Sequence, residues 1–461
     1  LLLLMKEESD TPFSFNPGDN IDQQKEGGSS SFFANNKKLI IILAVGIVLV
    51  IAIAVVLILV LTKSKSDKSI PAPNTPYPCE KTNNYFTARY EVPKANMEVK
   101  LFNQYAQNPL NLNYSNYVTC VEINNTSMNL TDGKFKFTKE GNYTANIYLK
   151  ENLNILDSFF DSCLNLVEID FSHLFVKQIT TMRKLFLGCT KFKTINYGND
   201  FNTNNLNNIS ELFCSCNSLE EIDFSHFDIS NVEDMSSTFQ GCSKLKKITF
   251  SNNINTKKVK YMRYLFSGCK SLSSLDLSGF DTSNVQNFEY MFQESSAITT
   301  LMLDNFNTEN ALDVSNMFEG CSGLVLLDLS KFSTANVVDM SSMFNGCTKL
   351  QSLTLKFKTN EVLYMDKMFQ NCQSLRSLDL SSFTNPKLTR MNEMFSGCQM
   401  LSSLDMSSFN SKLVVEMTET FYELPAEGTI TYDSSIFTEN LLSLIPSGWT
   451  RADKSNQTLF E

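Results

Sequence analysis

The chain has 461 residues, enough for roughly two or three domains, and its 39 Lys and Arg against 49 Asp and Glu give a formal net charge of −10. This acidic balance argues against a general nucleic-acid-binding function, which usually requires a basic patch or stripe. Twelve cysteines would favour disulfides in an oxidising compartment, but most of them recur at one period, so the repeat decides how they are interpreted.

The N-terminal part predicts a tail and a membrane span. Residues 1–38 are rich in Gly, Ser, Asn, Gln and charge, which is typical of a disordered, here cytoplasmic, tail. Residues 39–61 are an uninterrupted run of Leu, Ile, Val, Ala and one Gly. At about 1.5 Å per residue this run spans roughly 35 Å, enough to cross a bilayer as a helix. A cleaved signal peptide would have a shorter apolar core and a small-residue cleavage site.

The orientation of this span rests on glycosylation sequons. Lysines flank both ends, so the positive-inside rule does not decide. All Asn-x-Ser/Thr sequons come after the span, and five precede the repeats: Asn113, Asn124, Asn125, Asn129 and Asn142. We therefore predict a single-pass plasma-membrane protein with a cytoplasmic N-terminus and an extracellular, glycosylated remainder.

A spacer and a small domain follow. Residues 62–79 form a Pro-rich, extended linker. Residues 80–150 contain short β-prone runs separated by turn residues, which predicts a small antiparallel β domain that also caps the N-terminal edge of the repeats. Cys79 and Cys120 lie in or beside this domain and are candidates for a disulfide.

Residues 151–424 are one unit copied at a period of 25 to 27 residues. A cysteine slot marks each copy, at Cys163, Cys189, Cys216, Cys242, Cys269, Ser296, Cys321, Cys347, Cys372, Cys398 and Leu424. Near-equal units at this period predict a solenoid. We interpret the repeated cysteines as reduced and buried, because Ser and Leu replace them without breaking the period.

Each unit begins with an alternating segment. In the copy Leu272–Ser278, Leu275 and Leu277 fall on one face and Ser274 and Asp276 on the other. Stacked copies of this segment would form a parallel sheet with an apolar inner face and a polar outer face.

The second half of each unit predicts a short helix. Motifs such as Met340…Met343-Phe344 place apolar residues at i, i+3 and i+4. Asn or Asp precedes most copies as a helix N-cap, and Gly or Asn follows as a left-handed C-terminal stop. The predicted fold class is therefore an α/β solenoid of leucine-rich-repeat type, with a parallel sheet on one face and short helices on the other, preceded by the small β domain and the single transmembrane helix.

The full unit, MF-x-GC-x-x-L-x-x-L-D-L-S-x-F-x-T-S-N-V, resembles the BspA-like leucine-rich repeats, and the resemblance extends from about Leu153 to Trp449. It implies a cell-surface protein of the adhesin or binding type and carries over no catalytic residues. Residues 425–461 are irregular and are predicted to be a C-terminal cap and tail, with Trp449 covering the last repeat.

The polar face of the sheet is the candidate partner-binding site. Its acidic and hydroxyl residues are Ser274, Asp276, Asp328, Ser352, Ser377, Asp379, Ser403 and Asp405. Asp379 and Asp405 fall on adjacent repeats, where two carboxylates repel unless a cation or a donor lies between them. Two interpretations stay open: these residues only keep the sheet wet, or they bind a cation or a polar ligand.

No nucleophile triad, phosphate loop or metal motif occurs, and the only two histidines, His173 and His226, occupy a permissive repeat position. We therefore expect no enzyme activity, no cofactor, no metal and no nucleic-acid partner. The predicted function is binding of an extracellular protein or glycan, in adhesion or recognition. The alternative is a structural surface coat assembled by lateral packing of solenoids. The sequence determines neither the ligand nor the oligomeric state.

Overall fold

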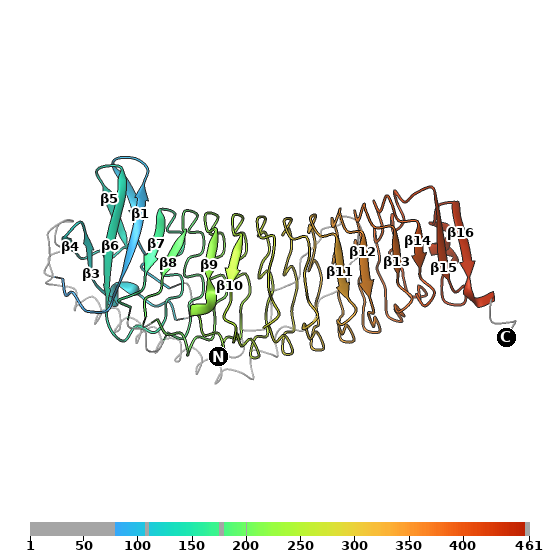
Figure 1. The fold of residues 1–461 in the computed structure, drawn as a ribbon, viewed down its shortest axis with the longest axis horizontal. Coiled ribbons are helices and arrows are strands. Elements are labelled where there is room, and N and C mark those ends of the chain that lie inside the picture. The colour runs from blue at the N-terminus through green and yellow to red at the C-terminus, as the bar shows by residue number, and fades with distance from the viewer. Residues whose placement is uncertain (1–78, 107–109, 175–178, 200, 457–461) are drawn as a thin grey trace, which may run out of the picture. The chain divides into compact units, whose positions relative to one another are not determined.

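The computed structural model describes residues 79–106, 110–174, 179–199 and 201–456. They belong to one compact unit, Asn74–Glu461. The unit is a solenoid whose rungs are stacked side by side in chain order, between a small β domain and the strand pair β15–β16 (Figure 1). The predicted repeat solenoid is confirmed.

The β domain is built from antiparallel pairs. They join β1 (Tyr85–Val92) to β6 (Gly141–Leu149), β6 to β3 (Val118–Ile123), β3 to β4 (Thr126–Met128), and β2 (Met97–Lys100) to β5 (Lys134–Phe137). A short 3-10 turn, η1 (Tyr114–Asn116), precedes β3. On its other edge β1 also pairs antiparallel with β7 (Leu166–Asp170), the first strand of the solenoid. The domain therefore covers the edge of the first rung with main-chain hydrogen bonds.

Within the solenoid, corresponding strands of neighbouring rungs pair in parallel. The pairs are β7 with β8 (Thr194–Asn196), β9 (Glu221–Asp223) with β10 (Lys247–Thr249), β11 (Leu326–Leu329) with β12 (Ser352–Leu355), and the series β13 (Ser377–Asp379), β14 (Ser403–Asp405), β15 (Glu427–Tyr432) and β16 (Gly448–Asp453). The remaining elements are the turns η2 (Phe224–His226) and η3 (Lys454–Asn456) and one helix, α2 (Glu439–Ser443). We call the outward side of these strands the strand face.

The short helices of the predicted α/β fold class are wrong. Where they were expected, alternate backbone N–H groups donate to the next rung: Met182 to the carbonyl of Asn208 (3.0 Å), Lys184 to Ser210 (3.0 Å) and Phe186 to Leu212 (2.9 Å). The intervening N–H groups close turns within the rung, as from Leu185 to the carbonyl of Met182 (3.2 Å). The fold of the described residues is therefore a mostly β solenoid, and its helix α2 lies after the last repeat.

The turns explain why the pattern misled. The predicted left-handed Gly slot does have positive φ, for example 68° at Gly188 and 74° at Gly346. A second residue four positions earlier is also left-handed although it is not Gly, as at Lys184 (φ 56°) and Ser342 (φ 55°). Type II turns require positive φ at their third residue, and two in each segment prevent a helix. Spacing of i, i+3 and i+4 points side chains inward in either geometry, so the spacing alone did not distinguish them.

Ladders of identical residues fill the core. Eleven phenylalanines, from Phe160 to Phe421, stack in sequence with neighbouring ring centroids 5.5–5.9 Å apart. Beside them the buried Cys thiols donate to Phe carbonyls of the preceding rung, as from Cys269 Sγ to Phe239 O (3.2 Å). Ser295, not Ser296, takes the Cys slot in its rung, since its Oγ donates to Phe266 O (2.7 Å). All ten repeat cysteines are free and buried, as predicted.

The predicted membrane topology also needs correction. Among the described residues, no helix is both long enough and apolar enough to cross a bilayer. The run 39–61, on which the single-pass span and the plasma-membrane location rested, lies outside the described residues, as do the tail 1–38 and most of the linker 62–79. The transmembrane helix is therefore removed from the fold class, and the plasma-membrane location with it.

Candidate functional site

The strand face presents the predicted partner-binding residues to solvent. Strand geometry alternates side chains, so Leu277 is buried and Leu275 partly buried, while their neighbours point outward. Seven of the eight predicted residues are exposed, and Asp405 is half-buried. The exposed ones are Ser274, Asp276, Asp328, Ser352, Ser377, Asp379 and Ser403.

The structure brings only some of these residues together. On β13 and β14, Ser377 pairs with Ser403 and Asp379 with Asp405. On β11 and β12, Asp328 lies opposite Thr354, and Ser352 lies opposite Leu326. Ser274 and Asp276 are separated from this group by the rung of Met302, whose side chain is 83% exposed. The continuous polar part of the strand face is therefore its C-terminal part, from β12 to β15.

Each aspartate on this face also closes the end of its strand. In four of them, Oδ1 accepts a hydrogen bond from the backbone N–H two residues later, at 2.8–2.9 Å: Asp276, Asp328, Asp379 and Asp405. This Asx turn is a structural role that sequence reasoning did not assign. It leaves the second carboxylate oxygen available for a ligand.

The same hydrogen bonds keep the carboxylates ionised. The backbone N–H of Ser278 lowers the pKa of Asp276, and that of Ser330 lowers the pKa of Asp328. The side chain and N–H of Ser381, with a smaller contribution from the charge of Lys454, lower the pKa of Asp379. The strand face is therefore anionic well below neutral pH.

The aspartate pair has a basic neighbour that the sequence did not reveal. Lys454, in η3 beyond the last strand, places its Nζ 3.5 Å from Oδ2 of Asp405. This ammonium group offsets the repulsion between the adjacent carboxylates. Thr429 and Thr431 of β15 lie opposite Ser403 and Asp405 and extend the hydroxyl rows by one rung. Their β-prone alternation was the available signal, but they fall after the last recognisable repeat.

Nearer the N-terminus, Asp276 and Ser278 line a hollow of about 350 Å³ on the strand face, together with Lys247 and Thr249 of β10. Among the described residues, no group of three or more His, Cys, Asp or Glu side chains is arranged to hold a metal ion. The two histidines are exposed and stack on tyrosines, His173 on Tyr85 and His226 on Tyr197, each at 4.5 Å.

The remaining predicted sites lie in the β domain. Cys79 and Cys120 form a disulfide. Asn124 and Asn125 lie in the β3–β4 turn, and they are exposed, as are Asn129 and Asn142. Asn113 is half-buried, and its Oδ1 accepts from the Ser115 N–H at the start of η1 (2.9 Å). Four of the five sequons are thus open to solvent.

The repeats match the family described as "Mycoplasma protein of unknown function, DUF285", over residues 154–253, 246–325 and 314–430. Together the three stretches span residues 154–430, more than half of the 461 residues. No curated protein matches the chain. The match is consistent with the resemblance to BspA-like surface repeats, although the matched family does not carry that name.

Proposed function

We propose that this chain, which belongs to the family described as "Mycoplasma protein of unknown function, DUF285", is a non-enzymatic recognition protein that binds a protein or glycan partner on its strand face. The observation that supports this role is the ordered polar surface of β12 to β15. There, hydroxyl residues and the Asp379–Asp405 pair lie in register on adjacent strands and point to solvent. A solenoid repeats such slots on every rung and so builds an extended binding surface.

The chemistry of this surface selects the partner class. Carboxylates held ionised by Asx turns attract basic groups, and rows of Ser and Thr hydroxyls exchange hydrogen bonds with sugar hydroxyls or peptide groups. We infer a basic or hydroxyl-rich ligand, as would suit an adhesion or recognition protein resembling the BspA-like repeats.

The test replaces Asp328, Asp379 and Asp405 with Asn together. Asn keeps the Oδ1 acceptor of each Asx turn, so the fold should persist in circular dichroism. The full chain is first screened against glycan and protein arrays, and the affinity of the triple variant is then measured for the best ligand. Binding should weaken, and more at low salt, where the lost attraction is least screened. Unchanged affinity would remove the strand face from the proposal.

A matched control replaces three carboxylates away from the strand face, Asp281, Glu309 and Glu361, with their amides. All three are exposed, so the control loses the same charge without touching the proposed surface. Equal weakening in both variants would mean that net charge, not this site, governs binding.

One observation favours lateral assembly of solenoids as a second candidate function. On the opposite ladder of bridges, consecutive rungs expose apolar side chains: Leu312 is 51% exposed, Val338 37% and Val415 76%. Their N–H groups lie in one hydrogen-bonded series, so the side chains form a row. Concentration-dependent association in sedimentation, abolished by Leu312→Gln with Val415→Gln, would favour this candidate. A monomer at all concentrations would exclude it.

A further inference from the structure

One rung of this acidic chain is entirely basic. Between Met235 and Leu275 there is no Asp or Glu, whereas the same stretch contains Lys244, Lys246, Lys247, Lys257, Lys258, Lys260, Arg263 and Lys270. We call these eight residues the basic rung. Against a net charge of −10, such a concentration of cations in one turn of the solenoid indicates a local anion-attracting surface.

Half of the basic rung is neutralised by adjacent rungs. Four of its cations form ion pairs of 2.6–2.8 Å: Lys246 with Glu220, Lys260 with Glu233, Arg263 with Glu289 and Lys270 with Glu294. The other four, Lys244, Lys247, Lys257 and Lys258, are exposed and have no ion-pair partner in the part of the chain that the structure describes. They supply positive charge beyond what the fold consumes.

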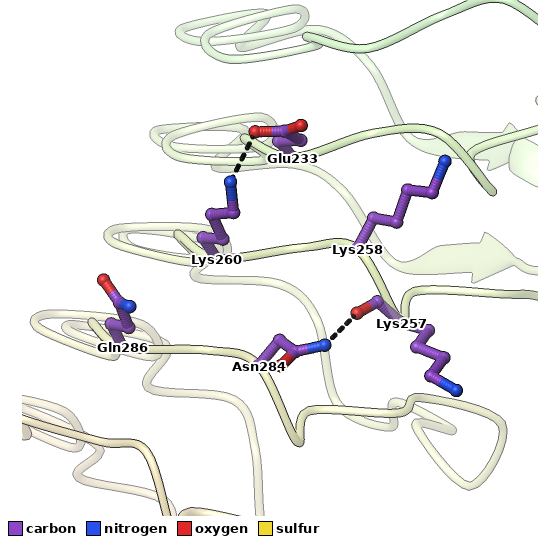
Figure 2. A pocket seen from close by; sticks show the side chains of 6 residues that line it. All are labelled: Glu233, Lys257, Lys258, Lys260, Asn284 and Gln286. Carbon is purple, nitrogen blue, oxygen red and sulfur yellow. Dashed lines mark hydrogen bonds and ion pairs between the residues drawn. The ribbon is translucent and has the colours of Figure 1, made fainter.

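Two of these lysines line a pocket. It has a volume of about 390 Å³ and is formed by Glu233, Lys257, Lys258, Lys260, Asn284 and Gln286, which come from three successive rungs. Figure 2 shows Lys260 turned toward Glu233, while Lys257 and Lys258 extend freely beside Asn284. The lining has three cations and one anion, and the amides of Asn284 and Gln286 add neutral polar groups.

The pocket lies where the repeat departs from its own pattern. In other rungs the corresponding residue is Asn, and its Nδ2 donates to a carbonyl of the preceding rung at 2.6–2.8 Å: Asn231, Asn284, Asn310 and Asn336. In the basic rung this residue is Lys258, which instead donates from Nζ to Oδ1 of Asn231 (2.6 Å). The fold does not need a lysine here, since Asn serves the neighbouring rungs.

We propose that the pocket binds sulfate groups of an acidic polysaccharide, with Lys257 and Lys258 as the main contacts. Adjacent rungs are about 4.8 Å apart, so the basic rung matches the width of a single chain. A wider duplex would overlap acidic side chains of the flanking rungs, such as Glu233 and Glu289. Single-stranded nucleic acid is bound on aromatic stacking platforms, and no residue lining this pocket is aromatic. This site is independent of the strand face, which would repel the same ligand.

The experiment measures binding of heparin to the full chain, with single-stranded DNA and desulfated heparin as comparison ligands. The double variant Lys257→Gln, Lys258→Gln should bind heparin about 10-fold more weakly, and the slope of log affinity against log salt should become shallower by about 2. The variant Lys257→Arg, Lys258→Arg keeps both charges and should bind like the parent. Circular dichroism checks that each variant is folded.

A matched control, Lys331→Gln with Lys349→Gln, removes two exposed lysines from distant rungs and should leave heparin affinity within 2-fold. Full affinity in the Lys257/Lys258 variant, or equal loss in the control, would overturn the site. Tighter binding of single-stranded DNA than of heparin, or undiminished binding of desulfated heparin, would overturn the assignment to sulfated polysaccharide. None of these outcomes depends on the strand face or on the Asp-to-Asn variant.

Discussion

Alkaline pH should unfold the solenoid because its cysteine ladder is buried. Burial raises the pKa of the ten free thiols, to about 12 for Cys321 and for Cys398. In an unfolded chain a thiol titrates near about 8.5. The folded state therefore holds more protons between these pH values. The stability contribution of each thiol is complete below pH about 8.5 and is lost as pH rises above it.

The expected loss is large because the thiols act in parallel. Well above pH 8.5 each buried thiol lowers the free energy of unfolding by about 1.4 kcal/mol per pH unit. For the ten thiols together, the loss between about pH 8.5 and 9.5 is on the order of 10 kcal/mol. A typical domain has only about 5–15 kcal/mol in total. We therefore expect loss of structure between about pH 9 and pH 10.

The assay follows far-ultraviolet circular dichroism and thiolate absorbance together as pH is raised. The comparison variant replaces Cys242, Cys269 and Cys321 with Ser, since Ser295 already fills the same slot and donates the same hydrogen bond. With three of ten titrating thiols removed, the midpoint should move to higher pH. Thiolate absorbance that rises before the structure is lost, or an unchanged midpoint in the variant, would refute the role of the buried thiols.

Two further predictions concern the packing of the rungs. Phe292 is fully buried between Phe266 and Phe318, with centroids 5.7 and 5.6 Å away, so Phe292→Ala should cost about 3–5 kcal/mol in urea unfolding. Phe421→Ala, at the end of the ladder with one stacked neighbour, should cost less, and equal costs would argue against the stacked ladder. Tyr264 has a φ of 56°, so Tyr264→Val should lower the thermal midpoint more than Tyr264→Asn. The reverse order would contradict the left-handed turn.

The repeat period and the direction of each strand residue could be predicted from sequence, because both depend on local alternation. Leu277 is buried and Asp276 exposed as the pattern indicates. The turns could not, because the Met-x-x-Met-Phe spacing satisfies a helix and a pair of type II turns equally. What distinguishes them is positive φ at residues such as Lys184 and Tyr264, which carry no glycine signal. The hydrogen bonds that decide the geometry run between rungs, so no single repeat contains them.

The candidate sites divide along the same line. The register of Asp379 and Asp405 follows from the period alone, and the sequence placed them on adjacent rungs. The approach of Lys454 to Asp405 depends on how the chain folds after the last repeat, which the period does not determine. The pocket beside Lys258 was missed for a different reason. The basic run was visible, but each of its lysines was interpreted as a variable surface position, without regard to the Asn hydrogen bond that it replaces.

That replacement suggests where function is encoded in this chain. The core slots of each rung are restricted, because Phe, Cys and the left-handed turn residues are held by contacts with both neighbouring rungs. An outward slot that forms a hydrogen-bonded ladder, such as the Asn series, is restricted more weakly, since losing one surface amide bond costs about 1 kcal/mol. A rung that gives up such a bond for an unpaired cation loses stability without any gain in packing. Lys258 is such a case, and its position beside a pocket provides the compensating reason, namely the binding of an anion.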